Sequence, residues 1–398
     1  MPSFQATVTV LGLLLMVGAL ASGLARRSLL SLAALFVLAG FALGNGGAGW
    51  IDFHARSGFV SDLAFTALIV ILFRDGLEVE GEMLQTAWRL PLRKLVLAMP
   101  ITAIIVAGAG HVLVGLSWTE SFLLGALLAP TDPVLTSSIV TNPRVPRLVR
   151  HSLNLESGLN DGLALPAVLA FLAALAPDSG HFVWWRFVLG DVGLGFLFGI
   201  ACGWVASLLM PRSEHSIPPH QKSLFALGVA FATYGVTVLS PKGNGFIAVF
   251  VAAIVLGLRR SDLRAHFEQR ADGIVEIVKL GIFLVLGSLL TFHALTRDGW
   301  AAVGVVAVTF LLARPVAVWI ALAGTGVDRA TRLFMGWFGP KGIATVTFSL
   351  LVLDRNIASG ERIFDLTALA VFCSIILHGI TDTPGAAWIA RRSRPDQA

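Results

Sequence analysis

A run of polar residues that can bind protons or metal ions stands inside an otherwise apolar segment of the chain. Residues 156–161 read Glu-Ser-Gly-Leu-Asn-Asp and lead directly into the apolar stretch 162–175. Carboxylate and hydroxyl oxygens are the ligands that hard cations prefer. A charge at the centre of a bilayer costs at least about 2.5–3.5 kcal/mol, so ionisable residues at that depth usually belong to an ion or proton pathway. The run therefore predicts an ion or proton site within a membrane.

Helical geometry divides this run into two faces. Residues four apart share a face of a helix, so Ser157 lies with Asp161 and Glu156 lies with Asn160. The first pair offers a hydroxyl and a carboxylate to a cation. The second pair offers a carboxylate beside an amide, which is typical of a structural partner for a buried base. We expect that base to be Arg314, because an unpaired buried charge is very costly, and we interpret Glu156 and Arg314 as an architectural ion pair.

Composition supports a membrane protein made entirely of helices. The chain is 56% hydrophobic and 13% charged, whereas soluble domains carry about 25% charged residues. Crossing a bilayer takes about 20 apolar residues per helix. We count thirteen such segments. They lie at about 5–25, 29–47, 58–77, 93–115, 119–139, 151–175, 184–210, 222–240, 245–258, 272–294, 299–323, 331–353 and 365–390.

The basic residues between these segments predict the orientation. Nineteen Lys and Arg, among them Arg89, Arg93 and Lys94, fall in alternate loops, and six fall in the opposite loops. Since cytoplasmic loops are the more basic ones, the N-terminus is expected outside and the C-terminus in the cytoplasm. The net charge of +5 is thus a topology signal and does not indicate a nucleic-acid partner.

Several other classes of protein find no support in the sequence. Cys202 and Cys373 both lie in apolar spans, so no disulfide framework is implied. The nine His are scattered, and neither a hydrolase elbow nor a zinc-protease motif is present. We therefore expect neither an enzyme nor a cofactor. The first segment lacks a basic leader and is expected to be a retained helix. The last span ends close to residue 398, so we expect no nucleotide-binding domain on this polypeptide.

Two of the spans are interrupted in mid-membrane. Pro130 and Pro133 flank Thr131-Asp132 in one span, and Gly336-Trp-Phe-Gly-Pro-Lys-Gly342 interrupts another. Prolines remove backbone donors and free nearby carbonyls, which must then be satisfied by protein, water or an ion. Paired interruptions in the two halves of a chain indicate an inverted-repeat transporter with its site at the midplane. Lys341 would offset the partial negative charge of half-helix C-termini there.

These features together predict a ligand set for a monovalent cation. The set comprises Asp161, Asp132, the Ser157 hydroxyl and an oxygen of Thr131. A carboxylate that binds either a proton or a cation couples the two fluxes without further machinery. Four further basic residues, Arg74, Lys279, Arg314 and Lys341, also fall within membrane spans.

The order and spacing of these motifs resemble a known family. They are Thr131-Asp132-Pro133, the run 156–161, Arg314 in a late helix, Gly339-Pro340-Lys341-Gly342 and His378-Gly379-Ile380-Thr381. Together they resemble the electroneutral monovalent cation:proton antiporters of the NhaP type, and the resemblance covers essentially the whole chain. It implies a thirteen-helix fold, a homodimer, and a core bundle (about 93–175 and 299–390) that moves against a dimerisation scaffold (about 1–90 and 184–294).

The resemblance also implies roles for individual residues. Asp161 would carry the cation and the proton in turn, assisted by Asp132, Thr131 and Ser157. The acid Glu156 would be tied to Asn160 and to Arg314. Asn160, at the position where electrogenic relatives carry a second Asp, implies one cation per proton.

The chain departs from the family pattern at two places. The third span reads Phe73-Arg74-Asp75-Gly76-Leu77 where the family has Phe-Glu-Gly-Gly-Leu, so the acid Asp75 has moved one position, about 100° around a helix. Lys341 replaces a common arginine and loses the bidentate fork. Sodium/proton exchange is the main hypothesis, with lithium as a further substrate, and the changed third span is where the preference for sodium could differ. Potassium/proton exchange and, in a different class, an ion channel or sensor stay open as alternatives.

Overall fold

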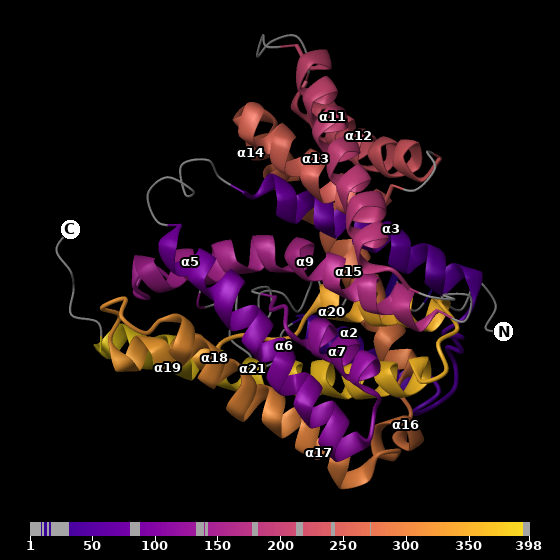
Figure 1. Ribbon diagram of the computed structural model, residues 1–398, viewed down its shortest axis with the longest axis vertical. Helices are drawn as coiled ribbons and strands as arrows, with labels where there is room; N and C mark the ends of the chain where they lie inside the picture. The colour runs from indigo at the N-terminus through magenta and orange to yellow at the C-terminus, as the bar shows by residue number, and fades with distance from the viewer. Residues whose placement is uncertain are drawn as a thin grey trace.

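The described part of the chain is built entirely from helices in this computed structural model (Figure 1). It comprises residues 9, 12–13, 16, 32–79, 88–132, 139, 142–176, 182–211, 218–239, 243–270 and 272–392. The helices of the first half are α2 (Leu32–Leu43), α3 (Gly58–Leu77), α5 (Arg89–Arg93), η1 (Lys94–Ala98), α6 (Met99–Ala109), η2 (Gly110–Val114), α7 (Trp118–Leu128) and α9 (Arg147–Leu175). Those that follow are α10 (Trp184–Phe187), η4 (Val188–Val192), α11 (Gly193–Leu209), α12 (Pro219–Leu239), α13 (Gly245–Arg259), α14 (Ser261–Arg270), α15 (Asp272–Leu289) and α16 (Phe292–Thr296). The last are α17 (Gly299–Ala307), η5 (Val308–Ala313), α18 (Arg314–Ala321), α19 (Arg329–Trp337), α20 (Ile343–Asp354) and α21 (Gly360–Arg392).

The helices agree with the spans predicted from hydropathy. Within the described residues, six continuous helices are long and apolar enough to cross a membrane, and four more are apolar but shorter. The η segments are π-helical turns within such continuous helices, as in Arg89–Val114 and Gly299–Ala321. Each predicted span after the first contains a described helix. The first span, 5–25, lies mostly outside the described residues.

Small residues let several helices approach closely. Gly195, Gly199 and Gly203 recur every four residues along α11, and a Cβ on any of them would meet a backbone carbonyl of α13 or of its N-cap residue at 2.6–2.8 Å. Such stripes of small residues are a common means of packing helices in membranes, because they allow the backbones to approach. They hold α11 against α13, and the two helices run together in the upper part of Figure 1.

Three clusters of buried apolar side chains form the interior. The largest links α3, α7 and α9 with α13 and α20. The second joins α2 and α15 to α3, α20 and α21. The third lies where the first turns of α9 meet α18, α19 and the end of α21. The long helix α9 takes part in two of these clusters, so its central residues are held on several sides.

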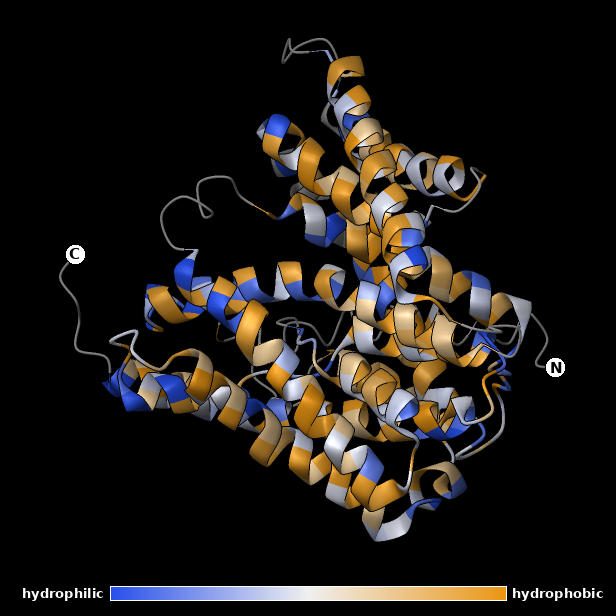
Figure 2. Cartoon of the chain, in the orientation of Figure 1, coloured by the Kyte–Doolittle hydropathy of each residue, from blue (hydrophilic) through white to orange (hydrophobic). Residues whose placement is uncertain are grey.

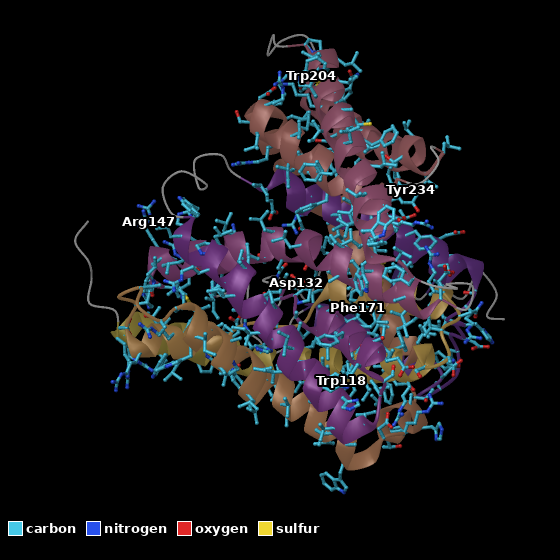
Figure 3. The ribbon with its side chains drawn as sticks, in the orientation of Figure 1. Trp118, Asp132, Arg147, Phe171, Trp204 and Tyr234 are labelled. Carbon is cyan, nitrogen blue, oxygen red and sulfur yellow. The ribbon has the colours of Figure 1, made fainter. Side chains whose placement is uncertain are left out.

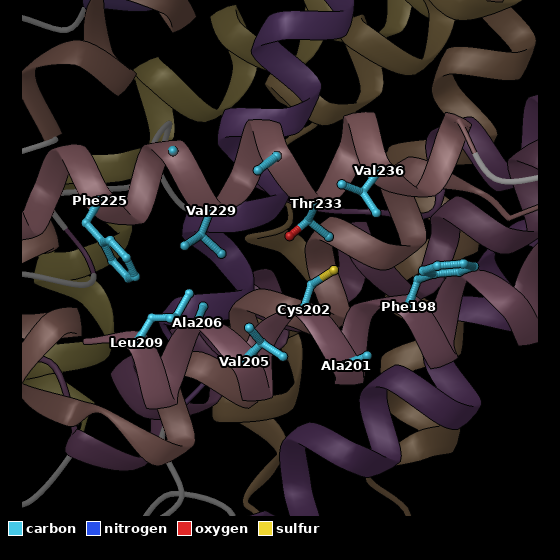
Figure 4. A pocket seen from close by; sticks show the side chains of 12 residues that line it. Phe198, Ala201, Cys202, Val205, Ala206, Leu209, Phe225, Val229, Thr233 and Val236 are labelled. Atoms are coloured by element: carbon cyan, nitrogen blue, oxygen red, sulfur yellow. The ribbon is translucent and has the colours of Figure 1, made fainter. Parts of the chain in front are cut away.

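The outer surface has the character expected of a membrane protein. Orange, hydrophobic residues predominate along most of the helices in Figure 2, and blue, hydrophilic residues are frequent near helix ends. Trp118, Trp184 and Trp300 stand at or next to helix starts and are more than half exposed, which is typical of an aromatic belt at a membrane interface. An apolar groove of about 570 Å³ also opens between α11 and α12, lined by Phe198, Cys202 and Phe225 among others (Figure 4).

Candidate ion-binding site

The two interrupted helices meet at their breaks. Helix α7 ends at Leu128 and the chain continues without helix to Asp132, while α19 ends at Trp337 and α20 begins at Ile343. The backbone N–H of Asp132 donates to the carbonyl oxygen of Pro340 at 2.8 Å. Asp132 lies in the interior of the bundle (Figure 3). The predicted crossing of two broken helices is therefore confirmed, although Pro133 lies outside the described residues.

Opposite charges satisfy the helix ends at this crossing. The ammonium of Lys341 donates to the carbonyls of Ala129 and Pro130 at 3.3 and 3.0 Å, at the C-terminal end of α7. The Asp132 carboxylate accepts the first N–H of α20, from Ile343, at 3.1 Å. A cation at a helix C-terminus and an anion at an N-terminus are both favourable. Lys341 thus lies where the sequence predicted.

Two glycines of the second break leave space for charged side chains. A Cβ at Gly342 would overlap the carboxyl group of Asp132, and one at Gly339 would overlap the guanidinium of Arg314. The two glycines of the Gly-Pro-Lys-Gly sequence therefore make room for buried side chains, in addition to interrupting the helix. Any larger residue at either position would displace a buried charge.

Ser157 and Asp161 face a common cavity, as the spacing on α9 predicted. The cavity has a volume of about 40 Å³, enough for a water molecule or a small ion. Asp132 also lines it, from the break after α7. Both aspartates are at most 7% exposed. One carboxylate oxygen of Asp161, Oδ1, is buried without a hydrogen-bond partner among the described residues, and such an atom is a natural ligand for an ion or a proton.

Asp75 reaches the same cavity from α3. Its side chain is 7% exposed and lines the cavity together with that of Asp161. The one-position shift of this acid along the third span does not remove it from the site. Repulsion between two adjacent carboxylates is relieved when a proton or a cation lies between them, so the pair is suited to hold either.

Thr131 and Asn160 bind one another. The Asn160 side-chain amide donates to the backbone oxygen of Thr131 at 2.7 Å and to its hydroxyl at 3.0 Å. In this conformation both Thr131 oxygens are engaged, and Thr131 is not among the residues that line the cavity. The expected tie between Asn160 and Glu156 is not formed, because the amide turns to the broken helix instead. The contact holds the non-helical segment 129–132 against α9.

The predicted ion pair between Glu156 and Arg314 is present and has a third member. Arg314 donates to both oxygens of Glu156 at 3.0 and 3.3 Å. Lys94, from the start of the long helix Arg89–Val114, donates to Glu156 at 2.6 Å and to the carbonyl of Ser152 at 3.1 Å. The assignment of Lys94 to a basic loop was wrong, because its ammonium is fully buried. Its sequence neighbours Arg89 and Arg93 made it look like part of a loop cluster.

Other charged residues of the cavity were not singled out as site residues. Lys279 of α15 and Glu78, the C-cap of α3, both line it. Arg74, which the sequence left without a role, forms an ion pair with Glu78 at 2.7 Å. The four-residue spacing of Arg74 and Glu78 is a signal that could have found this pair. Lys279 falls within a predicted span, but which residues it faces depends on how α15 packs, so the sequence did not place it beside Asp161.

The arrangement places oxygen ligands around a small space without closing a cage. Within the described ranges no three His, Cys, Asp or Glu side chains are close enough together to hold a metal ion. The carboxylates come from α3, α9 and the broken segment, so relative movement of these elements would change the distances between them. Such a site can exchange its occupant as the helices move.

Comparison with known proteins places the chain among cation exchangers. The family model for the transmembrane region of sodium/hydrogen exchangers matches residues 12–388. The K(+)/H(+) antiporter NhaP of Alkalimonas amylolytica is 25% identical over all of this chain and 70% of its own length. The K(+)/H(+) antiporter NhaP2 of Shewanella sp. (strain MR-4) is 26% identical, over 94% of this chain and 65% of its own length.

A solved structure shares the fold. The sodium proton antiporter MjNhaP1 from Methanocaldococcus jannaschii superimposes with a TM-score of 0.83 at 19% identity, over 98% of this chain and 99% of that one. The present chain therefore spans nearly all of that transporter, and about two thirds of the two bacterial relatives. The chain belongs to the sodium/hydrogen exchanger family of transmembrane proteins.

Proposed function

We propose that this protein is a secondary active antiporter that exchanges a monovalent cation for a proton. The observation that carries the proposal is the unsatisfied oxygen of Asp161, buried beside a cavity that Asp132 and Ser157 also line. A cation and a proton would compete for this carboxylate. Because either occupant supplies one positive charge, the exchange would be electroneutral, one cation for one proton.

The neighbouring residues would have distinct roles in this exchange. Asp132, Asp75 and the Ser157 hydroxyl would supply further oxygens to the bound cation. Thr131 would join them only in a conformation in which Asn160 releases it. Glu156, Arg314 and Lys341 would hold the broken helices in place without touching the ion.

The resemblance to cation exchangers extends the proposal to the whole assembly. A core of about 93–175 and 299–390 would move against a scaffold of about 1–90 and 184–294, and the scaffold would form a homodimer. In this division Asp75 and Lys279 would belong to the scaffold and Asp161 to the core, and all three line the cavity. The protein would lie in a prokaryotic inner membrane, with its N-terminus outside and its C-terminus in the cytoplasm.

Sodium is the proposed substrate, with lithium accepted as well. Potassium is the second candidate, since the two bacterial relatives compared above are described as potassium/proton antiporters. Oxygen ligands of the kind present here serve either ion. A channel or sensor of the same fold is the contrasting class, and it would lack fixed coupling between the two fluxes.

Everted vesicles with a pH-sensitive dye test the proposal directly. Addition of sodium, lithium or potassium in turn should collapse an imposed proton gradient, and the most effective ion identifies the substrate. In proteoliposomes, an imposed proton gradient should drive cation uptake at a fixed ratio. Absence of a response to all three ions would refute both exchange hypotheses, and ion flow without a coupled proton flow would indicate a channel.

A further inference from the structure

Lys279 is a buried cation at the edge of the cavity that holds Asp161. It comes from α15, is 7% exposed and lines the cavity together with residues of α9. The carboxylates of Asp75 and Asp161 line the same cavity of about 40 Å³. Among the described residues, no carboxylate comes within ion-pair distance of it. Lys279 therefore acts on the aspartates through its charge and is not fixed to one of them.

The other charges in and near the cavity are engaged in contacts of their own. Arg74 is paired with Glu78 at 2.7 Å, which gives no net charge. Asp132 and Lys341 hold the ends of the two broken helices and are opposite in sign. Three charges then remain, those of Asp75, Asp161 and Lys279. Two carboxylates and one ammonium leave a single negative charge.

We propose that Lys279 is a tethered counter-ion for the carboxylates of Asp75 and Asp161, which lowers the negative charge of the empty site by one and so moderates its attraction for a cation. This inference rests on the proposed exchange function and concerns the cation affinity of its site. With Lys279 in place, one of the two carboxylate charges is compensated. Without it, two uncompensated carboxylates would attract the cation more strongly.

The proposal assigns opposite effects to the two members of the pair. In Asp75→Asn, Lys279 is left facing Asp161 alone and repels the incoming cation. In Lys279→Gln, the additional negative charge attracts it. In a medium of effective dielectric constant about 20, one unit charge within roughly 10 Å of the ion shifts an affinity by about tenfold or more. If Lys279 served only to pack α15, Lys279→Gln would weaken cation binding both in the parent protein and in Asp75→Asn.

Calorimetric titration of the purified full chain in detergent with NaCl, KCl and LiCl, at constant ionic strength, measures these effects. Sodium is the reference ion, and potassium replaces it if the vesicle assay selects potassium. We expect Asp75→Asn to weaken cation binding about tenfold or more and Lys279→Gln to tighten it by a similar factor. The double variant Asp75→Asn/Lys279→Gln should bind about tenfold more tightly than Asp75→Asn. Weaker binding in Lys279→Gln, or no recovery in the double variant, would overturn the proposal.

Two control variants separate charge from structure. Lys279→Arg keeps the charge and should bind close to the parent protein. Glu276→Gln removes a charge from an exposed position one turn earlier on α15 and should leave binding unchanged. If Lys279→Gln alone fails to fold, the double variant retains the net charge and still decides the question. If the parent exchanges cations but the double variant does not recover cation affinity, only the counter-ion role of Lys279 is refuted. If the parent neither binds nor exchanges cations, the proposed function is refuted as well.

Discussion

The ammonium of Lys341 lies 3.0 Å from the backbone carbonyl oxygen of Pro130, so a residue from one broken helix satisfies the free end of the other. The reverse contact is made by Asp132, which caps α20. Each interruption thus supplies the charge that the other needs. The crossing is held together by reciprocal hydrogen bonds between charges and helix ends, two from Lys341 and one to Asp132.

Removal of the Lys341 charge should weaken this crossing. In Lys341→Met, the carbonyls of Ala129 and Pro130 lose their donor in a buried place, which costs about 1–3 kcal/mol for each unsatisfied group. We expect a lower melting temperature in detergent and a smaller monodisperse fraction. Lys341→Arg should recover part of the loss, because it keeps the charge. A Lys341→Met protein as stable as the parent would contradict the role of this contact.

The group formed by Glu156, Arg314 and Lys94 should respond asymmetrically to substitution. Glu156→Gln leaves two buried cations facing each other, and breaking a buried pair costs about 3–5 kcal/mol. Lys94→Met should be milder, because Arg314 still neutralises Glu156. Folded yield and thermal unfolding provide the measurement.

A double substitution separates charge balance from packing in this group. Glu156→Gln/Lys94→Met should be more stable than Glu156→Gln alone, since it removes one of the two unbalanced cations. Glu156→Gln and Arg314→Ala should lower folded yield before they alter ion selectivity. Normal yield with changed selectivity would show that Glu156 takes part in ion binding.

The two hydroxyl side chains of the predicted ligand set should behave differently. Ser157 lines the cavity, so Ser157→Ala should raise the KM for the cation with little change in stability. Thr131→Val removes the hydroxyl that accepts from Asn160 and should chiefly lower stability, by about 0.5–1.5 kcal/mol. The cation dependence of exchange, together with thermal unfolding, checks both. An equal rise of KM in both variants would mean that Thr131 reaches the ion during transport.

The sequence predicted those parts of the site that follow from periodicity and charge balance. Residues four apart on α9 share a face, which placed Ser157 with Asp161. A buried carboxylate needs a buried base, which paired Glu156 with Arg314. The paired helix breaks, each with a charge, indicated that the two interruptions meet at one site.

What the sequence missed depends on contacts between distant helices. Lys94 follows Arg89 and Arg93, so the sequence assigned it to a basic loop. Its burial depends on packing against α9, which the sequence does not show. Asn160 could form hydrogen bonds along its own helix or across to the broken segment. In the structure its amide donates to the backbone oxygen and the hydroxyl of Thr131 in the broken segment. Lys279 lay in a predicted span, but the buried face of α15 is set by its neighbours.

The most direct test of the account compares cation-driven proton flux in proteoliposomes of the parent, Asp161→Asn and Asp62→Asn. Asp62 is an exposed acid on α3, so its substitution controls for the loss of a carboxylate in general. We predict exchange in the parent and in Asp62→Asn, and none in a folded Asp161→Asn protein, because an amide can take up neither the proton nor the charge of the cation. Retained coupled exchange in Asp161→Asn would contradict the assignment of Asp161 as the shared carrier.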